Sequence, residues 1–207
     1  MPFGRDTIFE SHMNSVADTL IATGGYLAGQ QIKIEIVRPM INYLEKNFDY
    51  PLVGVEIGIY RGGNTQRILD KLQIKHIYLV DPYINYPEYS AKLNLEILLI
   101  ATIETAYKIA EKRLQPYKDK ISFIFEKSED AADKIPDNLD FVYIDGNHSY
   151  DYIKNDIETY YPKVRQGGII GGHDIRLKDI ERVTVGFAYK HDLELNIDPP
   201  DWWIIKK

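Results

Sequence analysis

Two short stretches of this 207-residue chain gather the residue types that do chemistry. The first, Asp145-Gly-Asn-His-Ser-Tyr150, holds an acid, an amide, an imidazole and two hydroxyl groups. The second, Gly171-Gly-His-Asp174, adds another imidazole and another carboxylate. Imidazoles titrate near neutral pH, and carboxylates bind hard divalent ions. The two stretches therefore predict a site that works through a general base or through a metal ion.

A glycine-rich turn lies earlier in the chain. The β-branched run Val53–Ile57 is typical of a buried parallel strand, and a helix is expected from Thr65, with Asn64 as its cap. The turn between them reads Glu56-x-Gly58-x-x-x-Gly62-Gly63, whereas a dinucleotide fold has Gly-x-Gly-x-x-Gly. This spacing favours a cofactor that lacks a pyrophosphate. An ordinary strand-to-helix turn is the alternative.

An aspartate ends the next predicted strand, His76–Val80. It is Asp81, which lies 81 − 58 = 23 residues after Gly58. This spacing places a carboxylate at the carboxyl end of a neighbouring strand, where α/β folds bind ribose hydroxyls. The alternative is a turn aspartate before Pro82.

Four segments, taken in order, resemble the motifs of class I S-adenosylmethionine-dependent methyltransferases. They are the glycine-rich turn, Leu79-Val-Asp81, Tyr143-Ile-Asp-Gly-Asn-His-Ser-Tyr150 and Gly167-Gly-Ile-Ile-Gly-Gly-His-Asp174. Together they most resemble the small-molecule O-methyltransferase branch, which includes catechol-type enzymes and the sugar O-methyltransferases of macrolide and aminocoumarin tailoring. The resemblance covers roughly Pro51 to the C-terminus and implies an enzyme of EC 2.1.1 type.

The resemblance implies S-adenosylmethionine as the cofactor. The residues that it places against the cofactor come from the glycine-rich turn, from the ends of the second and fourth strands and from the segment after the third: Glu56, Gly58, Tyr60, Gly62, Gly63, Asn64, Asp81, Ser128, Glu129 and Asp145. Ser128 would equally serve as the N-cap of a short helix, with Glu129 favouring its start.

Two mechanisms are compatible with the second half of the site. Methyl transfer to oxygen needs a deprotonated hydroxyl, so the expected catalytic residues are His173, His148 and Asp145, with a histidine as the base. Alternatively, Asp145, Asp174 and His173 hold magnesium or another divalent ion. Metal-dependent relatives carry two acids, or an acid and an amide, where this chain has His173-Asp174. An imidazole suits a softer ion than magnesium.

The expected fold class is α/β: a Rossmann-like, doubly wound, mostly parallel sheet of seven strands with an antiparallel strand near its C-terminal edge. Residues 1–50 are expected to form an N-terminal helical cap segment, including a helix over Glu35–Phe48, and residues 51–207 the cofactor-binding domain, in a chain that is a single domain overall. The predicted core comprises Val55, Ile57, Leu79, Phe123, Phe125, Val142, Ile144 and Ile170.

Further expected elements complete the chain. A third strand is predicted over Ile121–Glu126 and a long helix over Ala91–Leu114. A tail of one helix and two strands, joined through Pro199 and Pro200, includes Trp202 and Trp203 as packing residues. The tyrosines Tyr83, Tyr86 and Tyr89 form either a substrate wall or ordinary packing.

Composition limits the partners and the compartment. The net charge of −6 argues against a broad nucleic-acid footprint, and the family resemblance implies a small-molecule substrate. The absence of cysteine excludes a disulfide and a thiolate nucleophile, and no apolar run approaches membrane-spanning length. We expect a soluble, cytoplasmic protein, and the sequence leaves homo-oligomer formation open.

Two other function classes stay open. One is an N-methyltransferase that acts on a macromolecule, although the Asn/Asp-Pro-Pro-Tyr signature of amino-group methylation is missing after the fourth strand, where the chain reads Ile144-Asp-Gly-Asn. The other is a protein that binds a nucleoside cofactor without turnover. The density of acids and imidazoles around Asp145 and His173 favours catalysis.

Overall fold

A computed structural model describes residues 26–27, 30–31, 38–84 and 96–207. The chain divides into two compact units, Met1–Arg38 and Pro39–Lys207. In the first unit, β1 (Tyr26–Leu27) pairs antiparallel with β2 (Gln30–Gln31). The predicted roles of Tyr86 and Tyr89 lie outside the described residues.

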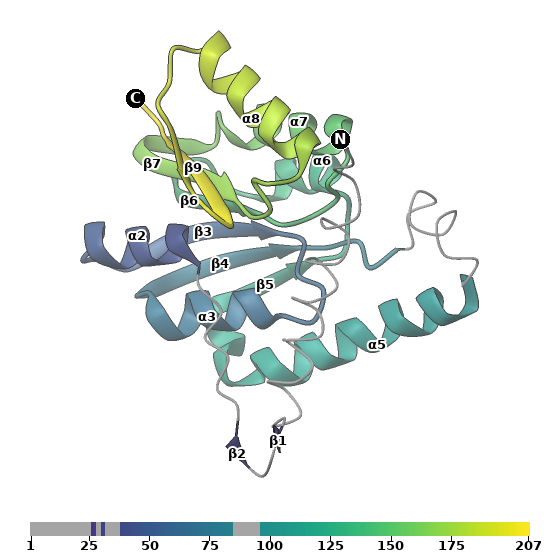
Figure 1. Ribbon diagram of the computed structural model, residues 1–207. Helices are drawn as coiled ribbons and strands as arrows, with labels where there is room; N and C mark the ends of the chain where they lie inside the picture. Colours follow the sequence, from purple (N-terminus) through teal and green to yellow (C-terminus); the bar gives the residue numbers. More distant parts are fainter. Residues whose placement is uncertain (1–25, 28–29, 32–37, 85–95) are drawn as a thin grey trace. The chain divides into compact units, whose positions relative to one another are not determined.

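The second unit is built around a seven-stranded sheet in the order β5-β4-β3-β6-β7-β9-β8 (Figure 1). Its strands are β3 (Leu52–Ile57), β4 (Ile74–Val80), β5 (Ile121–Ile124), β6 (Leu139–Ile144), β7 (Val164–Gly172), β8 (Leu195–Asp198) and β9 (Asp201–Ile205). The pairs from β5 through β7 are parallel, whereas β9 runs antiparallel to both β7 and β8. The predicted fold class is therefore confirmed, including its single reversed strand.

Helices cover both faces of this sheet (Figure 1). On one face lie α2 (Pro39–Asn47), α3 (Gly63–Lys71) and α5 (Glu96–Leu114), and on the other α6 (Ser128–Ala131), α7 (Tyr150–Tyr160) and α8 (Lys178–Lys190). Two short 3-10 helices, Gln115–Lys120 and Ala132–Lys134, precede β5 and β6. The expected start of α5 at Ala91 lies outside the described residues.

Alternation along the strands divides the core into two layers. In β6, Phe141 and Tyr143 pack with α2 and α3, whereas Val142 and Ile144 pack with α7 and α8. Burial of the predicted core is confirmed at six positions: Val55, Ile57, Leu79, Val142, Ile144 and Ile170.

The prediction for β5 was wrong at its end. Phe125 is 52% exposed, and Phe123 is only partly buried. The strand ends at Ile124 rather than at Glu126, and β5 is the edge strand of the sheet, paired only with β4. An edge strand has one neighbour, so its apolar side chains receive less cover than those of central strands.

Helix α2 begins at Pro39, four residues later than the predicted Glu35. Proline suits the first helical position because it has no N–H to satisfy there. The next N–H, that of Met40, donates to Oδ2 of Asp201 at 3.0 Å, and Oδ1 of the same carboxylate accepts the hydroxyl of Tyr143 at 3.0 Å. Asp201 is fully buried, so this carboxylate joins α2, β6 and β9.

The C-terminal hairpin packs as expected. Trp202 is fully buried in the layer of α7 and α8, and Trp203 is buried in the layer of α2 and α3. Both indoles therefore belong to the core, which confirms their predicted packing role. The strand before the turn, β8, begins at Leu195.

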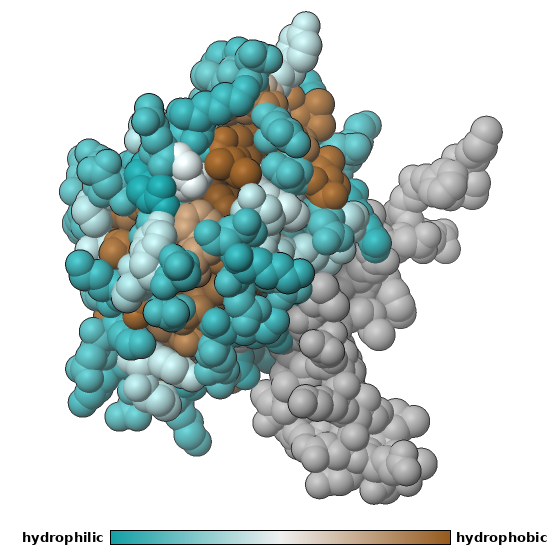
Figure 2. Space-filling model, turned by 90° about the vertical axis from the view of Figure 1, so that its left-hand side faces the viewer, coloured by the Kyte–Doolittle hydropathy of each residue, from teal (hydrophilic) through white to brown (hydrophobic). Residues whose placement is uncertain are grey.

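The face of the molecule drawn in Figure 2 is mainly hydrophilic where it is coloured. Figure 2 shows one side of the molecule, where hydrophobic side chains form smaller patches among hydrophilic ones. No helix within the described part of the chain is long and apolar enough to span a bilayer.

Replacing Asp201 with alanine is expected to lower the free energy of unfolding by about 2–4 kcal/mol, because the Met40 N–H and the Tyr143 hydroxyl would stay buried without their acceptor. Urea denaturation followed by circular dichroism measures this loss. Asp198→Ala is the matched control, since Asp198 is exposed on the neighbouring strand and should change stability by less than about 0.5 kcal/mol. Equal losses for the two variants would contradict the role of Asp201.

Candidate functional site

The glycine-rich turn is held by close contact between β3 and β6. Gly58 has φ +87°, and a Cβ at this position would lie 2.2 Å from the carbonyl oxygen of Asp145. The N–H of Asp145 in turn donates to the carbonyl of Ile57 at 2.8 Å. Only glycine fits here, because the backbones of the two strands meet where they leave the sheet.

Glu56 anchors the start of α3. Its side chain is 1% exposed, and its carboxylate accepts Nδ2 of Asn64 at 3.0 Å and the Thr65 hydroxyl at 2.5 Å. The predicted capping role of Asn64 was wrong: Gly62, with φ +71°, is the N-cap residue and makes no side-chain cap. The Asn64 amide instead holds the buried acid.

Asp81 fastens two turns together. Its Oδ2 accepts the N–H groups of Ile59 and Tyr60, each at 2.9 Å, and its Oδ1 accepts that of Tyr83 at 2.8 Å. The Tyr83 hydroxyl donates to the Tyr60 carbonyl at 2.9 Å, and both tyrosines have φ +48°. Each carboxylate oxygen can accept two hydrogen bonds, so Oδ1 keeps capacity for a ligand hydroxyl.

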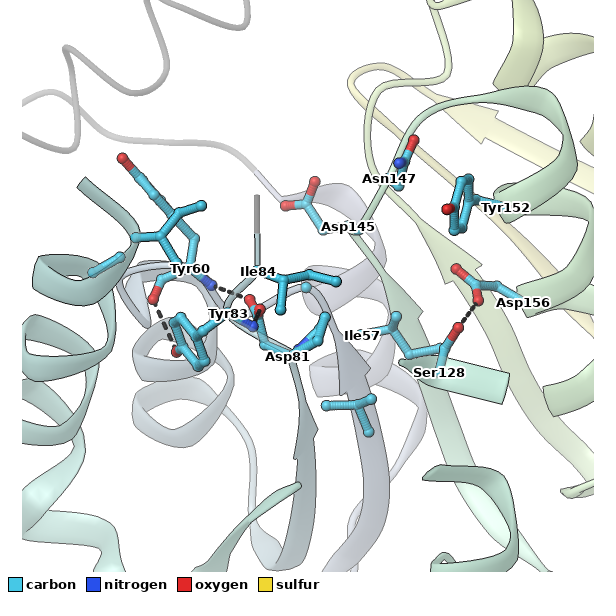
Figure 3. Close-up of a pocket in the computed structure, with 16 residues that line it drawn as sticks. Ile57, Tyr60, Asp81, Tyr83, Ile84, Ser128, Asp145, Asn147, Tyr152 and Asp156 are labelled. Atoms are coloured by element: carbon cyan, nitrogen blue, oxygen red, sulfur yellow. Dashed lines mark hydrogen bonds between the residues drawn. The ribbon is translucent and has the colours of Figure 1, made fainter. Parts of the chain in front are cut away.

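A cavity of about 300 Å³ opens at the carboxyl ends of β3, β4 and β6 (Figure 3). Its lining residues are Ile57, Gly58, Tyr60, Val80, Asp81, Pro82, Tyr83, Ile84, Ile103, Ala106, Ser128, Asp145, Gly146, Asn147, Tyr152 and Asp156. Figure 3 shows two sides of this cavity, with Tyr60, Asp81 and Tyr83 on one and Ser128, Asn147, Tyr152 and Asp156 on the other.

The structure brings half of the predicted cofactor residues to this cavity. Five line it: Gly58, Tyr60, Asp81, Ser128 and Asp145. The other five, Glu56, Gly62, Gly63, Asn64 and Glu129, are not among its lining residues. Most of this second group shapes the start of α3 rather than the wall of the cavity.

Asp156 was missed by the sequence analysis. It lies on α7 between Ile153 and Ile157, is 3% exposed, and accepts a hydrogen bond from the Ser128 hydroxyl through Oδ1. Burial raises the pKa of Asp156 to about 7; the Ser128 hydrogen bond opposes this shift, and the nearby Glu129 carboxylate adds to it. An acid at an inward position of an amphipathic helix was the available signal. The predicted N-cap role of Ser128 was wrong, because Ser128 lies inside α6.

Asn147 is a second residue of this wall without a predicted role. It is 7% exposed, and its Oδ1 accepts the N–H of Ser149 at 3.0 Å. Its Nδ2 is buried and has no hydrogen-bond partner among the residues that the structure describes. A buried amide that lacks an acceptor costs free energy, so this donor is suited to a ligand.

Two acids and two histidines meet beside the cavity, as predicted. Nε2 of His148 lies 3.3 Å from Oδ2 of Asp174 and 3.7 Å from Oδ1 of Asp145. Nδ1 of His173 lies 3.0 Å from Oδ1 of Asp174 and 3.7 Å from Oδ1 of Asp145. One side-chain atom each of Asp145, His148 and Asp174 lies within 4.8 Å of the others, so these three residues could hold a metal ion.

The two histidines differ in exposure and environment. The His148 side chain is 28% exposed, whereas that of His173 is 4% exposed. Burial lowers the pKa of His148, but the hydrogen bond and the charge of Asp145, with the charge of Asp174, outweigh it, so the net shift of the pKa is upward. Asp174 has φ +58°, a strained conformation of the kind that clusters at functional sites.

Residues 55–175 match a family model described as a methyltransferase domain. The chain belongs to this methyltransferase family. Among curated proteins, the methyltransferase is 28% identical over 144 residues to the uncharacterized protein R132 of Acanthamoeba polyphaga mimivirus. That match covers 67% of this chain and 57% of R132, so the methyltransferase spans little more than half of the length of this relative.

Solved structures share the fold of the methyltransferase. A putative caffeoyl-CoA O-methyltransferase from Staphylococcus aureus superposes with a TM-score of 0.61 at 15% identity, covering 96% of both chains. The O-methyltransferase NovP superposes with a TM-score of 0.58 at 18% identity, covering 81% of this chain and 76% of NovP. At such low identities, the likeness concerns the fold alone.

Membership in this methyltransferase family implies S-adenosylmethionine as the cofactor, and the cavity fits it. Ile57 and Val80 provide apolar surface for a flat base, and Asp81 offers a carboxylate for hydroxyl groups. The buried Nδ2 of Asn147 supplies a donor that no group in the described part of the chain accepts.

Asp156→Asn is expected to stabilise the methyltransferase more at high pH than at low pH. In the folded parent Asp156 stays protonated up to about pH 7, whereas in the unfolded chain it loses its proton near pH 3.8. The contribution of this group to the free energy of unfolding is therefore fully present below pH 3.8 and is lost as the pH rises through 7. The advantage of the variant should grow by roughly 3–4 kcal/mol between pH 4 and pH 8.

Denaturant midpoints across this pH range measure the effect. Asp151→Asn is the matched control, because Asp151 is exposed one turn earlier on the same helix and should show no such pH trend. A constant difference between Asp156→Asn and the parent would contradict the raised pKa.

Proposed function

We propose that this methyltransferase transfers the methyl group of S-adenosylmethionine to a hydroxyl group of a small molecule. The observation that carries the proposal is the meeting of Asp145, His148 and Asp174 at the edge of the cofactor cavity. Asp145 belongs to both, so an acceptor held by the cluster would lie beside the cofactor.

The reaction sets the demands on the site. The acceptor oxygen forms a bond to the methyl carbon, the carbon–sulfur bond breaks, and the hydroxyl proton must leave, giving a methyl ether and S-adenosylhomocysteine. Alignment of donor and acceptor supplies part of the rate. The remaining requirement is removal of the hydroxyl proton, because a neutral hydroxyl is a poor nucleophile.

In the base route, His148 accepts this proton. It is the more exposed histidine of the pair, and the carboxylates of Asp145 and Asp174 stabilise the imidazolium that forms. His173 is nearly buried, with Nδ1 at 3.0 Å from Asp174, so its geometry suits holding that carboxylate in place. The net upward shift of the His148 pKa favours a base that works near neutral pH.

In the metal route, Asp145, His148 and Asp174 hold a divalent ion, which lowers the pKa of the acceptor hydroxyl when bound. The sequence had proposed His173 as the imidazole ligand, whereas His148 joins the two acids in the three-residue group. Two carboxylates and one imidazole suit manganese at least as well as magnesium.

A small acceptor is favoured by the charge of the chain. The net charge of −6 repels polyanions, and the acids at the site add to this repulsion. Neutral hydroxyl compounds, such as sugars and phenols, are not subject to this charge repulsion.

For the cofactor, Asp81→Ala is expected to weaken S-adenosylhomocysteine binding about tenfold to a hundredfold, through loss of hydrogen bonds from ribose to a charged acceptor. Calorimetry measures the affinity. Asp81 also holds three backbone N–H groups, so unfolding of each variant without ligand separates loop damage from lost contacts. Asp70→Ala, an exposed acid on α3, is the control. If Asp81→Ala bound S-adenosylhomocysteine as tightly as the parent does, the assignment of Asp81 to the ribose would be wrong.

For the acceptor chemistry, His148→Ala is expected to lower methyl transfer at least a hundredfold while leaving S-adenosylhomocysteine affinity unchanged, because a positioned base contributes 10²–10⁴-fold. Transfer in the parent should fall as pH drops through the raised His148 pKa. Labelled S-adenosylmethionine with a panel of catechols and sugars provides the assay.

Chelation separates the two routes. Transfer that survives a chelator assigns the base route, and transfer that is lost and restored by manganese assigns the metal route. The control is His191→Ala, which removes an exposed histidine at the end of α8 and should leave transfer intact. Unchanged transfer in both His148→Ala and Asp145→Ala would show that the reaction occurs elsewhere.

A further inference from the structure

The cavity has a polar wall that includes two residues, Asn147 and Asp156, for which the sequence predicted no role. Asn147 and Asp156 lie on this wall with Ser128, on the side away from Asp81 (Figure 3). Both residues are more than nine-tenths buried, and each presents one polar atom that has no hydrogen bond to any residue that the structure describes.

Asp156 faces the cavity through Oδ2. Its Oδ1 accepts the Ser128 hydroxyl, and among the described residues no hydrogen bond reaches Oδ2. A Cβ built on Gly146 would lie 4.0 Å from Oδ2, and Gly146 itself lines the cavity. Oδ2 of Asp156 therefore lies beside another residue of the cavity lining, where a ligand in the cavity can reach it.

Asn147 supplies the complementary group. Its Oδ1 is occupied by the N–H of Ser149, which fixes the amide so that Nδ2 is the remaining donor. The wall thus offers one acceptor, from Asp156, and one donor, from Asn147. An edge of adenine has the matching pair: an exocyclic amine that donates and an adjacent ring nitrogen that accepts.

We propose that Asp156 and Asn147 bind the adenine edge of the cofactor by two hydrogen bonds. Oδ2 of Asp156 accepts one from the exocyclic amine, and Nδ2 of Asn147 donates one to the adjacent ring nitrogen N1. The proposal rests on S-adenosylmethionine as the cofactor. It makes this wall specific for adenine, because hypoxanthine presents a carbonyl and a ring N–H and so reverses both hydrogen bonds.

The neighbouring surfaces support a base at this place. Ile57 and Val80 offer apolar contact between the two sides of the cavity, as a flat ring needs. With Asp81 holding the ribose on one side, the base extends toward the other.

The test compares two ligands by calorimetry at pH 8: S-adenosylhomocysteine and its analogue with hypoxanthine in place of adenine. The parent is expected to prefer the adenine compound at least tenfold. Asp156→Ala should reduce this preference about tenfold or more, because it removes the acceptor of the amine and also the repulsion of the hypoxanthine carbonyl.

Asn147→Asp is the second variant. It keeps the oxygen that accepts the Ser149 N–H but replaces the donor by an acceptor, so the preference should again fall about tenfold or more. Asp151→Ala removes an exposed carboxylate from the same helix as Asp156 and should keep the parental preference. Thermal unfolding without ligand reports the folding of each variant separately.

The ratio of the two affinities decides the outcome. A variant that weakens both ligands equally has only a structural role, and this result would overturn the assignment of its residue. A parent without preference would overturn base reading by the whole wall. A parent that binds neither compound would refute the cofactor itself, which distinguishes that failure from failure of the base reading.

Discussion

The site depends on the backbone contact between the ends of β3 and β6. Gly58 lets the two chains meet so closely that a Cβ would lie 2.2 Å from the Asp145 carbonyl. At the end of β7, Gly172 repeats the device, because a Cβ there would lie 2.1 Å from the carbonyl of Ile144. These two approaches set the distance from the glycine-rich turn to Asp145, and from Asp145 to His173 and Asp174. The same backbone arrangement therefore positions both the cofactor cavity and the cluster of two acids and two histidines beside it.

Much of this arrangement could be predicted because it is local in sequence. The alternation of β6 and the acid at its end depend on consecutive residues of the chain. The convergence of Asp145, His148 and Asp174 also followed, since parallel strands end at one edge of the sheet.

The rest depends on contacts between distant segments. Asn64 was predicted as the N-cap because asparagine favours that position, but its side-chain amide donates to the buried carboxylate of Glu56 instead. Asp156 had no predicted role, because only the packing of α7 against α6 buries it beside the cavity. Phe125 looked like core until the sheet placed β5 at its edge.

The buried carboxylate of Asp201 has a consequence for synthesis of the chain. It accepts the N–H of Met40 across 161 residues of sequence. As the chain leaves the ribosome, the N–H of Met40 can meet this acceptor only after those 161 residues have been made. The central strands β3 and β6 are made much earlier than β9. A sheet without β9 would therefore exist on the nascent chain, and the edge of β7 that β9 later covers would be open to pairing with other strands.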